Sequence, residues 1–479
     1  MISFSIIGLL IIPTEPSAPV GPGGLALTLA MGILLLVVPR KWAPIPLAVV
    51  TCYTTFGQHI MIGGMNFYML RLLILFGFVR LLLKHEARNL TWLRIDTAVL
   101  LWATISVVAY VLLWQSQEAL VNALGYAYDA LGLYFLSRSL IRDIADIQRL
   151  CKIFAIMLLP LAIALCFEKA TGINPFYLLG GVPKYTEIRE GALRCQGPFR
   201  HPILTGCFGA VWLPLFVGLW LHDRRSRMFA VLGIACSSVI TVMSASSGPV
   251  GSYLVAVVGL LMFPLRTHMR KVRWATVAAI AALDIIMKDP VWFIFARFSF
   301  FSGSTGWHRS WLIDRTIHNF SDWWLVGTKS VEAWGVFAGD VTNQFIAQGT
   351  RAGLIVMFAF IWIVILAFRQ VGLAVRRTQG ERGDQFLVWA VGCSVLAHFV
   401  NFWNVSYFDQ NVVNWYLALA MSAAAFTIYC RRPRPVMNVP EADGQQFAVD
   451  FPDRFRRHDP DGMMPSYECF DESGESFDL

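Results

Sequence analysis

Apolar runs about as long as a bilayer is thick recur along most of this chain. A helix that crosses the hydrocarbon core needs about 20 apolar residues, with a range of about 17–25. Runs of this kind occupy residues 24–39, 42–57, 67–84, 95–114, 117–137, 150–167, 201–221, 228–243, 249–266, 273–288, 351–369, 386–402 and 411–430. They predict an all-α, polytopic membrane protein of about 12–14 transmembrane helices.

The N-terminal region leaves the number of spans open. Residues 3–13 are apolar but short, so they form a fourteenth span, an interfacial segment or the first part of the next helix. Pro39, Pro44 and Pro46 interrupt the first two runs, and proline disrupts the interior of a helix.

The composition of the chain supports a membrane protein. Of its 479 residues, 56% are hydrophobic and 15% are charged, whereas a soluble domain is about half apolar and about a quarter charged. The net charge of +8 does not indicate a nucleic-acid partner, because no soluble segment carries a basic stripe with interleaved aromatic residues. The nine cysteines form no CxxC or His/Cys cluster, so neither a disulfide framework nor a metal site is predicted.

Lysine and arginine cluster on alternate loops between the apolar runs. The clusters lie at residues 40–41, 80–94, 138–152, 224–227, 266–273, 369–382 and 431–434. Because cytoplasmic loops are enriched in these residues, we expect this side, including the C-terminus, to face the cytoplasm. The protein is thus predicted to be a multi-pass protein of the cytoplasmic membrane.

Two long loops fall on the opposite, outer side. They span residues 168–200 and 289–350, and the second is rich in tryptophan, which argues against disorder. We expect it to form a structured cap. Residues 1–430 then form one transmembrane domain, and residues 431–479, rich in Pro, Asp, Glu and Ser, form a disordered cytoplasmic tail.

The outer loops carry arginines that membrane topology does not require. Arg194 and Arg200 lie in the first loop, and Arg309 and Arg315 lie in the second. The planar guanidinium binds phosphate oxygens in pairs, so these residues are candidates for a phosphate site. A solvated or salt-bridged surface role is the alternative for each of them.

The conspicuous acids within the apolar runs are Asp129 and Asp284, and the conspicuous titratable base is His398. Such groups are costly at depth and face a partner or a cavity. For Asp129 we favour an interhelical hydrogen bond. Asp284 is close enough to the end of its run to reach the membrane surface.

Several segments together resemble the O-antigen ligase and polymerase superfamily of bacterial envelope glycan enzymes. They are LYFLSRSLIRDIADIQRL (133–150), RCQGPFRHPILTG (194–206), SASSGPVGSYLVAVVG (244–259), RSWLIDRTIHNFSDWWLVGTKS (309–330) and TNQFIAQGTRAGLI (342–355). The resemblance implies a membrane glycosyltransferase-like fold with a large outer loop. It also implies transfer of a glycan from a polyprenyl diphosphate to an acceptor sugar, with no cofactor or metal.

Two departures from the family pattern bear on the acceptor. Thr342, followed by Asn343, stands where the ligases have a histidine, and the SASSGP turn lacks the arginine usual after it. Both favour a polymerase for exopolysaccharide or O-antigen, whose acceptor is another lipid-linked repeat unit. Asp340 is the replacement base that we expect, since burial can raise the pKa of a carboxylate into a useful range.

The resemblance and the outer arginines together suggest seven site residues. The expected catalytic residues are Arg200, Arg309 and Asp340, and the expected substrate-binding residues are Arg194, His201, Arg315 and Asn343. The arginines would hold the diphosphate and stabilise it as it leaves, while Asn343 and His201 would position sugar groups.

The expected partners are a polyprenyl-diphosphate-linked oligosaccharide, membrane lipids, a chain-length regulator and a flippase. Two other functions remain open. One is a ligase that attaches the glycan to a different acceptor. The other is a polysaccharide transporter or flippase, a class that often has paired repeats and broken helices around a midplane site.

Overall fold

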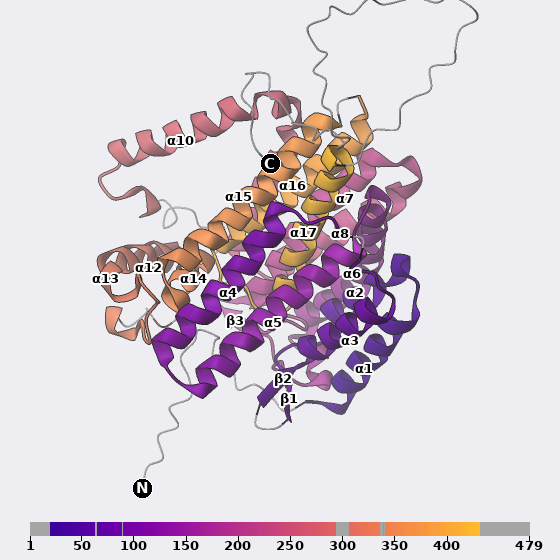
Figure 1. Cartoon of the computed structure of the whole chain (residues 1–479), viewed down its shortest axis with the longest axis horizontal. Coiled ribbons are helices and arrows are strands. Elements are labelled where there is room, and N and C mark those ends of the chain that lie inside the picture. Colours follow the sequence, from indigo (N-terminus) through magenta and orange to yellow (C-terminus); the bar gives the residue numbers. More distant parts are fainter. Residues whose placement is uncertain are drawn as a thin grey trace, which may run out of the picture. The chain divides into compact units, whose positions relative to one another are not determined.

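The computed structural model describes residues 20–62, 65–88, 90–293, 306–335, 339, 341–378 and 380–431. These residues form a mostly helical bundle (Figure 1), which confirms the all-α prediction in its broad form. Two short antiparallel hairpins accompany the helices: β1 (His59–Ile62) with β2 (Met65–Tyr68), and β3 (Glu187–Arg189) with β4 (Ala192–Arg194). The predicted segment 3–13, Asp340 and the tail after Arg431 lie outside the described residues.

Each of the thirteen predicted spans coincides with a helix. In chain order the α-helices are α1 (Pro22–Val37), α2 (Pro44–Tyr53), α3 (Met69–Leu83), α4 (Arg94–Trp114), α5 (Gln117–Leu140), α6 (Ile144–Thr171), α7 (Pro202–His222), α8 (Arg227–Met243), α9 (Ser247–Leu261), α10 (Met269–Ile286), α12 (Gly306–His318), α13 (Phe320–Trp323), α14 (Gln344–Ala352), α15 (Leu354–Arg377), α16 (Arg382–Phe402) and α17 (Gln410–Phe426).

Fewer of these helices than predicted are long and apolar enough to cross a membrane unaided. Among the described residues, seven helices are long and apolar enough to span a bilayer, and they include α4, α6, α7, α8, α15, α16 and α17. The number is eight if the bent pair α9–α10 forms one span. They suffice for a multi-pass membrane protein. The N-terminal helices are short because prolines interrupt them: α2 has 10 residues and begins at Pro44. By contrast α5 has 24 residues but carries several charged side chains.

The predicted spans at 249–266 and 273–288 differ most from a pair of straight helices. A 3₁₀ segment, Phe263–His268, separates α9 from α10, and the two helices are bent by 77° relative to each other. Pro264 lies in this segment, where its ring prevents a continuous helix. No residue of α10 is buried, so this helix packs against little of the described protein.

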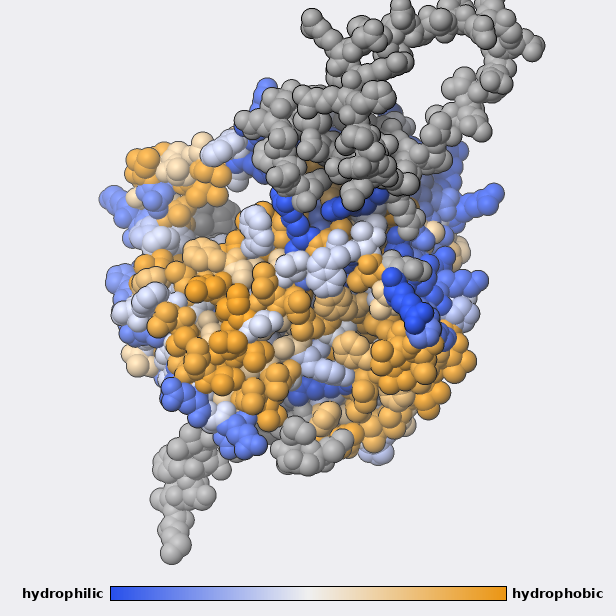
Figure 2. Space-filling model, in the orientation of Figure 1, coloured by the Kyte–Doolittle hydropathy of each residue, from blue (hydrophilic) through white to orange (hydrophobic). Residues whose placement is uncertain are grey.

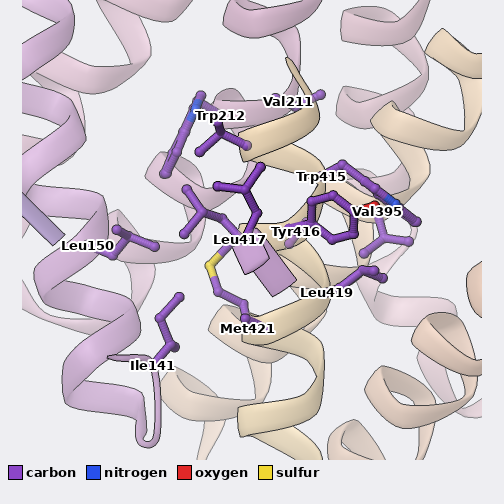
Figure 3. Packing of buried hydrophobic residues seen from close by; sticks show 14 of the residues in the cluster. Ile141, Leu150, Val211, Trp212, Val395, Trp415, Tyr416, Leu417, Leu419 and Met421 are labelled. Atoms are coloured by element: carbon purple, nitrogen blue, oxygen red, sulfur yellow. The ribbon is translucent and has the colours of Figure 1, made fainter. Parts of the chain in front are cut away.

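The C-terminal helix α17 forms the centre of the bundle. All of its residues except Val412 are buried, and many are alanine or other small residues, which allows neighbouring helices to approach closely. Figure 3 shows its side chains pointing toward Trp212 of α7, Leu150 of α6 and Val395 of α16. Trp212 in turn stacks on Phe154, with ring centroids 3.8 Å apart.

Large apolar side chains cover much of the face of the bundle that Figure 2 shows. On α4 and α15 the exposed ones are Leu100, Leu101, Val108, Leu112, Ile355, Phe358, Trp362 and Ile365. In water such a surface would drive association, whereas in a bilayer it faces lipid.

The predicted cytoplasmic loops meet at one end of the bundle. Arg40 and Arg149 both pair with Asp146, and Gln148 contacts His222, which pairs with Asp384 of α16. These contacts confirm that loops far apart in sequence share one end. That this end faces the cytoplasm stays a prediction.

A buried ion pair joins α4 to α5 near the same end. The carboxylate of Asp96 accepts hydrogen bonds from the Leu93 backbone N–H, the Tyr134 hydroxyl and the Arg138 guanidinium. Asp96 is fully buried and Arg138 is 3% exposed. Since neither charge reaches water, each depends on the other for its stability inside the protein.

We therefore expect Asp96→Ala to destabilise the fold by about 3–5 kcal/mol, because Arg138 would remain buried without its partner. Thermal denaturation of the purified protein in detergent measures this as a lower Tm. Glu118→Ala, which removes an exposed carboxylate from the neighbouring helix, is the matched control and should leave Tm nearly unchanged. Equal effects of the two substitutions would contradict the structural role of the pair.

Candidate functional site

The connection between α16 and α17, residues 403–409, receives side chains from several distant parts of the chain. Its last residue, Asp409, forms an ion pair with Arg200, which lies two residues before α7, with Nε–Oδ2 and Nη2–Oδ1 distances of 2.6 and 2.9 Å. Their side chains are only 11% and 8% exposed. Burial alone would lower the pKa of Arg200, but the adjacent carboxylate outweighs it and the pKa lies above its ordinary value.

The surroundings of Arg200 hold its side chain in one place. Its guanidinium lies over the ring of Phe408, 5.0 Å from the centroid. Its Cδ lies so near Gly57 that a Cβ there would come within 2.8 Å. The bidentate pair uses two of the five guanidinium N–H donors, and the other three have no hydrogen-bond partner in the part of the chain that the structure describes.

Arg309 approaches the other end of the same connection. Arg309 lies on α12 and is 7% exposed. Its Nε donates a hydrogen bond to the backbone oxygen of Asn404 at 3.3 Å. Next to it on α12, the Ser310 hydroxyl donates to the backbone oxygen of Trp292 at 2.9 Å. The segment that follows α10 is thereby attached to the helix that carries Arg309.

The start of α14 reaches the middle of the connection. Asn343 caps this helix by accepting hydrogen bonds from the backbone N–H groups of Phe345 and Ile346, as N-cap residues do. Beside it, Gln344 Oε1 accepts a hydrogen bond from the Tyr407 backbone N–H at 2.6 Å. The Tyr407 hydroxyl contacts His398 Nδ1 at 3.0 Å, so His398 has a partner within the protein.

Arg194 and His201 lie beside the β3–β4 hairpin. Arg194 pairs with Glu187 across the hairpin at 2.8 Å and donates to Ser246 Oγ in the SASSGP turn at 3.0 Å. His201 caps α7, its Nδ1 accepting a hydrogen bond from the Ile203 backbone N–H. Burial, aided by the positive charge of Arg194, lowers the pKa of His201 to about 4. The imidazole is therefore neutral at pH 7.

Several buried polar atoms near the connection have no hydrogen-bond partner among the described residues. Gln410 donates to the backbone oxygens of Thr54 and Pro198, yet its Oε1, Thr54 Oγ1 and Asn411 Oδ1 are unsatisfied. Leaving such atoms without a partner costs about 1–3 kcal/mol each.

The structure brings together some of the predicted residues. Arg200, Arg309 and Asn343 gather around residues 403–409, whereas Arg194 and His201 form a second group at the hairpin. Arg315 is exposed and lies over the ring of Trp311. Asp340 lies outside the described residues, so its predicted role as a base stays a prediction.

Asp409, Asn404 and Tyr407 were missed by sequence reasoning. Their signal is the polar sequence NVSYFDQN (404–411) between two apolar runs. Within the described ranges no three His, Cys, Asp or Glu residues form a group that could hold a metal ion. Two guanidiniums and one carboxylate reach the connection, an arrangement that suits an anionic ligand.

Comparison with models of known protein families gives no match to this chain, and neither does comparison with curated proteins.

We predict that His201 makes stability depend on pH. Its pKa is about 4 when folded and about 6.5 when unfolded, so the unfolded chain binds the proton more readily. The contribution is fully present above pH 6.5 and is lost as the pH falls toward 4, by roughly 3 kcal/mol. In His201→Asn, which keeps a good N-cap, Tm should fall less over this range. If Tm falls equally with pH in wild type and in His201→Asn, the lowered pKa of His201 does not control stability in this range.

Proposed function

We propose that this protein is a membrane glycosyltransferase that polymerises polyprenyl-diphosphate-linked glycan units at the outer face of the cytoplasmic membrane. The observation that carries the proposal is the convergence of Arg200 and Arg309. They come from two loops more than a hundred residues apart, yet they contact the two ends of one short connection. Arginines that meet at a short connection between two apolar helices suit a substrate with a lipid tail and a phosphate head.

The proposed reaction uses the lipid diphosphate of the donor as its leaving group. The acceptor hydroxyl attacks the anomeric carbon of the donor glycan, the bond from that carbon to the diphosphate oxygen breaks, and the lipid diphosphate departs. Arg200, oriented by Asp409, offers its remaining N–H donors to the developing charge, and Arg309 supplies a second guanidinium. Donors fixed in a site of low dielectric stabilise such charge more strongly than water does.

The hydroxyl proton requires a base. Asp340 is the residue that we propose, on the sequence pattern alone. His398 is a weaker candidate, because its Nδ1 is engaged by Tyr407. His201 also has too low a pKa, about 4, to be an effective base near neutral pH.

A transporter for the same lipid-linked glycan is the second candidate. The 77° bend between α9 and α10 favours it, because broken helices are common around transporter sites. A ligase differs from the polymerase only in its acceptor, which chemical analysis of the product identifies.

Reconstitution of the purified protein with a polyprenyl-diphosphate-linked repeat unit tests the proposal. Wild type should lengthen the glycan, and Arg200→Ala or Arg309→Ala should lower the rate about 10²–10³-fold, as loss of one stabilising donor does. Gel analysis of the glycan length measures the product.

Lys288→Ala removes an exposed cation from the segment after α10 and serves as the matched control with unchanged rate. Each variant needs a Tm close to that of wild type for its rate to count. Movement of unextended lipid-linked glycan across the vesicle membrane, without lengthening, would favour the transporter. Full activity of both Arg200→Ala and Arg309→Ala would contradict the assignment of these two arginines to the catalytic site.

A further inference from the structure

A second group of charged side chains lies where α3 and α5 meet. Arg71 of α3 binds Asp129 of α5 through both nitrogens of a bidentate pair, with Nε–Oδ1 and Nη2–Oδ2 distances of 3.0 Å each. This confirms the interhelical contact predicted for Asp129. Gly125, one turn before Asp129, makes room for the pair, because a Cβ there would lie 2.6 Å from Arg71 Nη2.

Arg351, at the end of α14, adds a second guanidinium to this group. It stacks on Tyr126 of α5, 3.9 Å from the ring centroid, and lies 5.0 Å from the ring of Tyr110. Tyr126 is held in place by Gln348, whose Nε2 donates to its hydroxyl. Arg351 is near enough to Asp129 for their charges to interact, but Arg71 already occupies that carboxylate.

The Arg351 guanidinium has no hydrogen bond to any residue that the structure describes, and its buried Nε is unsatisfied. Burial lowers its pKa, but a guanidinium remains charged in proteins. Two cations thus share one carboxylate, and Arg351 lies against the rings of Tyr110 and Tyr126. A buried charge without a hydrogen-bonding partner is costly, and among the described residues this group has one carboxylate for two guanidiniums.

This group opens sideways, toward the lipid-facing surface. The side chains of Arg71 and Asp129 are 19% and 23% exposed. Figure 2 shows hydrophilic side chains interrupting the hydrophobic face between α3 and α5. Charged residues at such a place are costly, and they often mark a functional site. A ligand that reaches them from the bilayer carries an apolar tail and an anionic head.

Tyr68 links this group to the candidate site at residues 403–409. Its ring lies 5.2 Å from the Arg71 guanidinium, and its hydroxyl interacts electrostatically with Arg200. The two arginine groups therefore share a neighbour, and ligands bound at both would lie side by side.

We propose that Arg71 and Arg351, with the rings of Tyr110 and Tyr126, form a second lipid-phosphate site, which holds the diphosphate of a second polyprenyl-linked glycan. The inference rests on the proposed function, because a polymerase joins two lipid-linked substrates whereas one diphosphate site serves a single donor. A ligand phosphate would accept the unused N–H donors of Arg351 and share those of Arg71 with Asp129.

Lipid binding tests the proposal independently of catalysis. The protein is placed in phosphatidylcholine nanodiscs, polyprenyl diphosphate without glycan is added, and native mass spectrometry counts the lipids retained. Arg351→Gln should bind one lipid fewer than wild type, with affinity at that site about tenfold to hundredfold weaker, as loss of a charge-assisted contact predicts. Combined with Arg200→Ala it should retain none.

A second variant guards against misfolding. Gly125→Ala keeps every charge but displaces the Arg71 guanidinium, and it should show the same loss, whereas the exposed Lys288→Gln should match wild type. Equal lipid counts for wild type, Arg351→Gln and Gly125→Ala would overturn the second site. So would displacement of the diphosphate lipid by an equal mole fraction of phosphatidylglycerol, since the site would then hold an ordinary headgroup.

The outcomes separate this inference from the proposed function. If Arg351→Gln loses one lipid while wild type transfers no glycan in the reconstituted assay, the second site stands and the glycosyltransferase proposal fails. If wild type lengthens the glycan while Arg351→Gln retains every lipid, the reverse holds.

Discussion

A charged group buried in a protein has no water around it, so its partner must come from the protein or from a ligand. In this chain that constraint determines which helices are joined. Asp96 with Arg138 joins α4 to α5, and Arg71 with Asp129 joins α3 to α5. Arg200 with Asp409 joins the segment before α7 to the start of α17. The apolar residues place the helices in the membrane, and the ion pairs fix how they are arranged within it.

The same constraint explains which parts of the site were predictable. Loops were assigned to one side from the positions of Arg and Lys, so arginines without a role in topology, such as Arg200 and Arg309, stood out. Asp409 did not stand out, because one carboxylate in a short connection resembles any loop residue. Its importance arises from a contact with a residue 209 positions away, which no local pattern records.

Apolarity predicted the positions of the helices correctly, but it did not predict which of them are long and apolar enough to span a bilayer. Each apolar run became a helix, since backbone groups in lipid must bond within the segment. The run at 42–57 became only the 10-residue α2, because prolines limited it. The run at 117–137 became the long α5, whose Asp129 and Arg138 make it more polar than a lipid-facing helix. Those charges are the ones that bond its neighbours.

The unpacked helix α10 has a mechanical consequence. With no buried residue to hold it, its tilt is set by the surrounding lipid, and a helix adapts to a thicker or thinner bilayer by tilting. Trp292, six residues beyond the end of α10, accepts a hydrogen bond through its backbone oxygen from Ser310, one residue along α12 from Arg309. We therefore expect a change in bilayer thickness to displace the helix that carries one of the two site arginines, so that the site would respond to the lipid composition of the membrane.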